Sequence, residues 1–156
     1  MELRVPRKRL PAFAEDWPDL FGQLYADVQV HDLERGFANC LAKGGLTIGK
    51  DLLRYRIEWR AKCADLIAPR DWKVTHSTDR AIWFWGAGLG QGLTADEKKI
   101  LKDLNAVFGR FVKGIDVQWS QQGPRMVYRL NSAGQMDMWE DDRWERGLEG
   151  WAAMNG

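Results

Sequence analysis

Two arginines spaced one helical turn apart are the strongest binding-site candidates in this sequence. The apolar residues predict a helix over residues 49–68, and Arg56 and Arg60 fall inside its wide apolar arc. Like charges at positions i and i+4 repel, so each guanidinium needs a carboxylate, a phosphate or an aromatic face. The acidic stretch Asp137 to Glu145 could supply carboxylates internally. Otherwise the pair forms an open anion site, or the two stems pack while their heads reach water.

The sequence holds two histidines, His31 and His76, and neither belongs to a metal-binding motif. No Cys-x-x-Cys or His-x-x-x-His spacing occurs, so we expect no metal site. Nothing singles out a serine or cysteine as a nucleophile. His76 and Thr78 are candidate cofactor-binding residues only if the chain is an enzyme, and for the function favoured below we expect no cofactor.

A glycine-rich stretch separates a predicted strand, residues 81–85, from a predicted helix. A strand, a glycine loop and a helix N-terminus can bind a phosphate, but the glycine spacing does not fit Gly-x-Gly-x-x-Gly, and no Gly-Lys-Ser/Thr follows. We therefore favour a mobile connection over residues 86–92 that lies beside a binding surface. Its candidate contact residues are Trp85, Gly88 and Gly90.

One motif resembles a known enzyme family. His76-Ser77-Thr78, followed by Gly92-Leu93, resembles the His-x-Thr strand and later Gly-Leu of ADP-ribosyltransferases. In that family the His and Thr/Ser contact the nicotinamide ribose of NAD. The resemblance therefore implies an NAD-dependent transferase in which His76 and Thr78 hold the cofactor, although no glutamate motif of that family follows.

Helices are predicted throughout the N-terminal half. Asp16 caps a helix that begins at Trp17, and a second helix over residues 32–43 ends at Gly44-Gly45. The buried side of the second helix is expected to carry Leu33, Phe37, Cys40 and Leu41. With the 49–68 helix it could form a helix-turn-helix whose recognition helix, residues 49–62, carries Arg54; an ordinary helical hairpin is favoured.

The C-terminal half predicts strands and two further helices. Short strands are expected at 72–76 and 81–85, the second of them central in its sheet. A capping box, Thr94 with Glu97, begins a helix over residues 95–112 that should bury Leu104 and Phe108. An antiparallel meander follows at 115–119, 125–130 and 136–139, and Asp141 or Asp142 caps a last helix. The fold class is α+β: a helical N-terminal half, then β-β-α-β-β-β-α with a largely antiparallel sheet.

Composition sets the remaining limits. A chain of 156 residues predicts a single domain over 1–156, and a net charge of +1 gives no electrostatic argument for nucleic acid or membrane. No signal peptide or membrane-spanning segment is recognised, which indicates a cytoplasmic protein. Cys40 and Cys63 are typical of core thiols, with a single bridge between them as the alternative.

These observations favour a small non-enzymatic protein that binds a macromolecular partner, such as an inhibitor or a phage or mobile-element accessory protein. Nine tryptophans and the segregated basic and acidic ends suggest a protein partner. Two alternatives stay open: a nucleic-acid binder that uses helix 49–62, and the NAD-dependent transferase that uses His76. A membrane partner is not expected.

Overall fold

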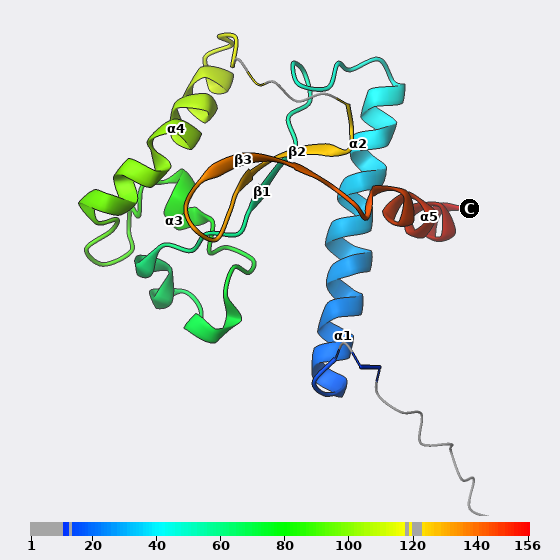
Figure 1. The fold of residues 1–156 in the computed structure, drawn as a ribbon, viewed down its shortest axis with the longest axis horizontal. Coiled ribbons are helices and arrows are strands. Elements are labelled where there is room, and N and C mark those ends of the chain that lie inside the picture. Colours follow the sequence, from blue (N-terminus) through cyan, green and yellow to red (C-terminus); the bar gives the residue numbers. More distant parts are fainter. Residues whose placement is uncertain (1–10, 13, 118, 120–122) are drawn as a thin grey trace, which may run out of the picture. The chain divides into compact units, whose positions relative to one another are not determined.

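A computed structural model describes residues 11–12, 14–117, 119 and 123–156 (Figure 1). The chain divides into two compact units, one formed by Met1–Cys40 with Arg143–Gly156 and the other by Leu41–Asp142. Helices and a three-stranded sheet together confirm the predicted α+β class. No helix in the described part of the chain combines the length and apolar character needed to cross a bilayer.

In the first unit, three helical segments follow one another without a break. They are α1 (Trp17–Ala26), the π-helical η1 (Asp27–Asp32) and α2 (Leu33–Lys43). Asp16 caps α1 by accepting a hydrogen bond from the Asp19 N–H at 2.7 Å, as predicted. The predicted buried side of the second helix is wrong, because Leu33 and Phe37 are exposed and Arg35, Gly36 and Ala38 are buried instead.

Helix α5 (Trp144–Asn155) packs against these segments through glycines. A Cβ atom at Gly36 would lie 2.1 Å from the Trp151 ring, and one at Gly150 would lie 2.3 Å from the Asp32 carboxylate. Glycines that weaken an isolated helix therefore allow two helices to approach closely. The predicted N-cap of this last helix, Asp141 or Asp142, is wrong. Arg143 occupies the N-cap position and makes no side-chain capping bond.

The second unit contains a mixed sheet in the order β1-β2-β3. Strand β1 (Tyr55–Ile57) pairs in parallel with β2 (Met126–Leu130), which pairs antiparallel with β3 (Met136–Glu140). The hairpin of the last two strands was predicted. The strand predicted at 115–119 is not observed, since residues 115–117 are irregular; Gln118 lies outside the described residues.

The predicted 49–68 helix is wrong. Its place is taken by β1, the 3-10 helix η2 (Lys62–Leu66) and irregular segments; another 3-10 helix, η3 (Arg70–Trp72), follows. Residues 55–59 alternate Tyr-Arg-Ile-Glu-Trp, the period of a half-buried strand, and the unusually wide apolar arc resulted from applying the helical period. The helix-turn-helix interpretation thus loses its recognition helix.

The strands predicted at 72–76 and 81–85 are also wrong. The first contains η3 and turns, and the second contains the short helix α3 (Arg80–Trp83). A short apolar run fits a buried strand or a buried helical turn equally well, so periodicity alone could not decide. Ala81 and Ile82 face the core, whereas Phe84 and Trp85 are exposed.

Helix α4 (Ala95–Val112) anchors the core of the second unit. Its capping box is present as predicted, and Leu101 and Leu104 pack with Ile82 and Leu130. The predicted burial of Phe108 is wrong, because that residue is 44% exposed. Both cysteines are free thiols; Cys40 is exposed rather than in a core, and Cys63 is half-buried.

Candidate functional site

Arg54 lies in a buried ion pair. Its guanidinium donates to Asp141 Oδ2 at 2.9 Å and to the Pro124 carbonyl oxygen, and the two charged side chains are 5% and 1% exposed. The acidic C-terminal stretch therefore does supply a carboxylate to an arginine, but this arginine is Arg54. The pair joins the segment before β1 to the end of β3.

Arg60 holds together the loop that follows β1. Its guanidinium donates to the carbonyl oxygens of Ala64 at 3.1 Å, Ala68 at 2.6 Å and Lys73, and to Asp65 Oδ1 at 3.1 Å. These bonds occupy the guanidinium of Arg60, and the Arg60 side chain is only 11% exposed. The predicted open anion site is therefore not formed at Arg60.

Arg56 lies on the sheet rather than on a helix. It donates to Glu58 at 2.8 Å and stacks over the Trp139 ring at 4.9 Å. It therefore has both the carboxylate and the aromatic face that its charge was expected to need. Glu58 directly follows β1, and Trp139 lies in β3.

His76 is exposed on a tight turn between η3 and α3. The hydroxyl of Thr78 accepts from the Thr75 N–H at 3.0 Å and donates to the Thr75 carbonyl at 2.7 Å, which closes the turn. Thr78 is 2% exposed. The structure thus uses Thr78 to fix the backbone and presents the imidazole to solvent.

Unusual backbone conformations surround His76. In the described part of the chain, the non-glycine residues with positive φ are Lys73 (54°), Ser77 (71°) and Trp85 (53°). Each such conformation costs on the order of 1–2 kcal/mol, and residues of this kind cluster at functional sites. The segment 73–85 is therefore the strongest candidate site that backbone geometry identifies.

The glycine stretch forms consecutive turns after α3. Gly86 donates to the Ala81 carbonyl at 2.8 Å, and Gly92 donates to the Leu89 carbonyl at 2.8 Å. A Cβ atom at Gly86 would lie 2.7 Å from the Cα of Gly92, so the two ends of the loop touch. Gly88 and Gly90 are exposed at its outer side, as is Trp85. Mobility of this loop stays a prediction.

The N-terminus of α4 is closed to an anion by a carboxylate of the chain itself. Glu97 accepts from the Thr94 N–H at 2.8 Å and from the Lys62 N–H at 2.7 Å. Burial alone would raise the pKa of Glu97, but these hydrogen bonds outweigh burial and hold it below its usual range. The phosphate cradle considered for this loop is therefore already occupied by a side chain.

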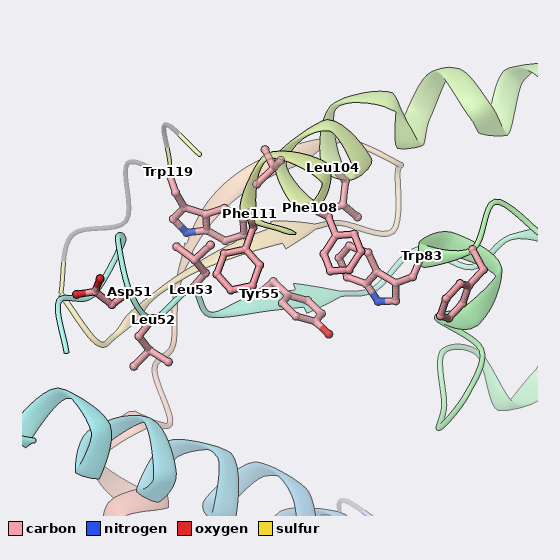
Figure 2. Close-up of a pocket in the computed structure, with 11 residues that line it drawn as sticks. Asp51, Leu52, Leu53, Tyr55, Trp83, Leu104, Phe108, Phe111 and Trp119 are labelled. Carbon is pink, nitrogen blue, oxygen red and sulfur yellow. The ribbon is translucent and has the colours of Figure 1, made fainter. Parts of the chain in front are cut away.

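A half-open cavity of about 420 Å³, called here the aromatic groove, lies between β1, α3 and α4 (Figure 2). Tyr55 and Trp83 meet edge to face with ring centroids 5.1 Å apart, and Trp83 lies 5.1 Å from Phe108. Burial, with the charge of Asp79, raises the pKa of Tyr55, so its phenol stays neutral. The lining residues are Asp51, Leu52, Leu53, Tyr55, Trp83, Phe84, Leu104, Val107, Phe108, Phe111 and Trp119.

Comparison with known proteins gives similarity to ester hydrolases. The chain is 43% identical over 148 residues to a carboxylic ester hydrolase of Gibberella moniliformis, and the match covers 95% of this chain and 27% of that protein. It is 29% identical over 130 residues to an uncharacterized esterase/lipase of Schizosaccharomyces pombe, covering 83% of this chain and 24% of that protein. The chain thus spans about a quarter of the length of these curated relatives. No protein-family model and no solved structure matches it.

These relatives overturn the function favoured by the sequence. A non-enzymatic inhibitor or phage accessory protein is wrong, because both relatives are named for ester hydrolysis. The nucleic-acid alternative lacks its recognition helix over residues 49–62, where β1 and η2 lie instead. The NAD alternative lacks its strand at His76, which lies on a turn. The sequence singled out His76 only through its resemblance to ADP-ribosyltransferases.

Proposed function

We propose that this chain forms the part of a carboxylic ester hydrolase that carries the catalytic base, and that His76 is this base. The observation that carries the proposal is an exposed imidazole on a strained turn, inside a region that is similar to ester hydrolases along nearly its whole length. A general base must reach the proton that it removes, and histidine fills this role most often.

The other histidine fits this role less well. His31 lies in the helical segment η1, which packs against α5, and it is half-buried. Its backbone has no positive φ, and the π-helical segment that contains it continues into an α-helix on each side. It therefore serves as the matched control for every experiment on His76.

In the proposed reaction the imidazole of His76 accepts the proton of a nucleophilic hydroxyl as its oxygen attacks the ester carbonyl carbon. The tetrahedral intermediate then expels the alcohol oxygen, which takes the proton from the imidazolium. A water molecule then hydrolyses the acyl-enzyme. His76 removes a proton from the water, the hydroxide attacks the acyl carbon, and the carboxylic acid leaves as the nucleophile regains its proton.

The nucleophile is not assigned to these residues. Many esterases carry it in a Gly-x-Ser-x-Gly turn, and the serines of this chain, Ser77, Ser120 and Ser132, do not lie in such a motif. The proposal therefore concerns the base alone.

The test is a graft in which this chain replaces the matched 148-residue segment of the Gibberella moniliformis enzyme. We expect the graft to hydrolyse p-nitrophenyl butyrate, His76→Gln to lower kcat by at least about 100-fold, and His31→Gln to change it less than about threefold. A folded graft without activity, or a His76→Gln graft with the parental kcat, would overturn the proposal. Circular dichroism establishes the folded state of each variant.

A further inference from the structure

Strand β1 is an edge strand whose outer side is unpaired within the described part of the chain. The Tyr128 N–H donates to the Arg54 carbonyl at 3.1 Å, and the Glu58 N–H donates to the Leu130 carbonyl at 2.8 Å. Since backbone groups alternate along a strand, residues 54, 56 and 58 face β2, and the backbone groups of Tyr55 and Ile57 face the opposite edge. Such an edge is a template for one more strand.

The aromatic groove adjoins this edge strand, because the side chain of Tyr55, a residue of β1, lines it (Figure 2). Its aromatic side chains are unusually accessible: Phe84 is 64% exposed, Phe111 is 51% exposed and Phe108 is 44% exposed. Soluble monomers rarely leave contiguous apolar surface of this kind uncovered, and clustered aromatic residues are typical of binding hot spots.

A single type of partner accounts for both features. A small apolar ligand would fill the groove but leave the backbone groups of β1 unpaired. An extended polypeptide beside β1 pairs them and places alternate apolar side chains in the groove. Among the described residues, Asp51 is the only charged one in the groove lining, so those inserted side chains should be uncharged.

The relatives indicate where such a polypeptide comes from. About three quarters of the length of each one has no counterpart in this chain. We propose that the β1 edge and the aromatic groove together bind an apolar strand of a polypeptide that corresponds to this unmatched part, which would bring His76 to the rest of the enzyme. This inference rests on the proposed function.

The experiment combines the chain with a polypeptide made of the unmatched part of the Gibberella moniliformis enzyme, both by mixing and by co-expression. We expect a one-to-one complex in size-exclusion chromatography and at least about tenfold slower amide exchange at Tyr55 and Ile57. Phe111→Asp should weaken binding at least about 30-fold, as expected for a hot-spot residue. Phe21→Asp, at a 69% exposed aromatic residue of the first unit, should change binding less than about threefold.

Several outcomes would overturn this inference. They are the absence of a complex in both arms, a Phe111→Asp variant that is folded and binds like the parent, unchanged exchange at Tyr55 and Ile57, or a homodimer of the chain that occupies this edge. The His76→Gln variant separates the two proposals. Parental binding by that variant with full ester hydrolysis overturns the catalytic role alone, whereas lost binding by Phe111→Asp supports the docking surface whatever the activity.

Discussion

The buried ion pair between Arg54 and Asp141 can be tested by changing one residue. The Asp141 carboxylate is 1% exposed and bonded to Arg54, so removing its charge breaks a buried ion pair. We expect Asp141→Asn to lower the free energy of unfolding by about 3–5 kcal/mol, as breaking a buried pair does. Chemical denaturation measures this loss. The control is Asp142→Asn, because Asp142 is exposed. An Asp141→Asn variant as stable as Asp142→Asn would contradict the buried ion pair.

Glu97 makes stability depend on pH in a defined direction. Its folded-state pKa lies below the ordinary value of 4.5, because backbone hydrogen bonds outweigh the effect of burial. The carboxylate therefore stabilises the fold above the pKa of the unfolded chain, and this contribution is lost as pH falls through the lower folded pKa.

The corresponding prediction compares Glu97→Gln with the parent by denaturation between pH 7 and pH 3. The parent should be more stable at pH 7, and the difference should shrink toward pH 3. Asp96→Asn controls for the loss of one charge in the first turn of α4. A difference that stays constant over this range would show that the Glu97 carboxylate does not titrate as proposed.

At the scale of elements, glycines decide how helices of the first unit pack. Alanine in place of a helical glycine normally stabilises a helix by about 0.8–1.0 kcal/mol. At Gly36 the new Cβ atom would meet the rigid Trp151 ring at 2.1 Å, and overpacking of this kind costs about 1–3 kcal/mol. We expect Gly36→Ala to lower the melting temperature. Gly22→Ala should raise it, because its Cβ atom would meet no described atom within 4 Å beyond its chain neighbours and its own helix backbone. Equal shifts would contradict the packing of α5.

The glycine loop after α3 provides a second matched pair. Gly86 and Gly88 share a positive φ, 70° and 75°, so alanine should strain both backbones similarly. Only at Gly86 would the Cβ atom also meet backbone, at 2.7 Å from Gly92. We expect Gly86→Ala to cost at least about 1 kcal/mol more than Gly88→Ala in urea unfolding, the lower end of the overpacking range. Equal losses would mean that the loop does not close on itself.

Elements with strong local signals were predictable. The capping box of α4, the cap of α1 and the β2–β3 hairpin all depend on neighbours in sequence, and all are present. The parallel pairing of β1 with β2 joins residues more than seventy positions apart, and such pairing leaves no local signal in the sequence. The alternating pattern over residues 55–59 was too short to separate from a helix. Which face of a helix is buried depends on tertiary contacts, so helical spacing alone could not predict that Phe108 is exposed.

At the scale of the whole molecule, the candidate site was only partly predictable. His76 could be singled out as one of two histidines, but the strain around it and the exposure of its ring come from the folded backbone. Arg54, Arg56 and Arg60 were predicted as binding residues because of their charge, yet each forms an ion pair inside the chain. The direction toward ester hydrolysis comes from the relatives.

The most direct test of the proposed catalytic role of His76 is chemical rescue in the grafted enzyme. Replacing His76 with glycine leaves space where the imidazole stood, so added imidazole can act as the base. We predict that His76→Gly loses at least about 100-fold in kcat/KM for p-nitrophenyl butyrate, the range for a general base, and that imidazole restores a saturable part of the loss. Glycine at His31 should show neither the loss nor the rescue. Parental kcat/KM in His76→Gly, or a loss that imidazole does not restore, would contradict the assignment of His76 as the base.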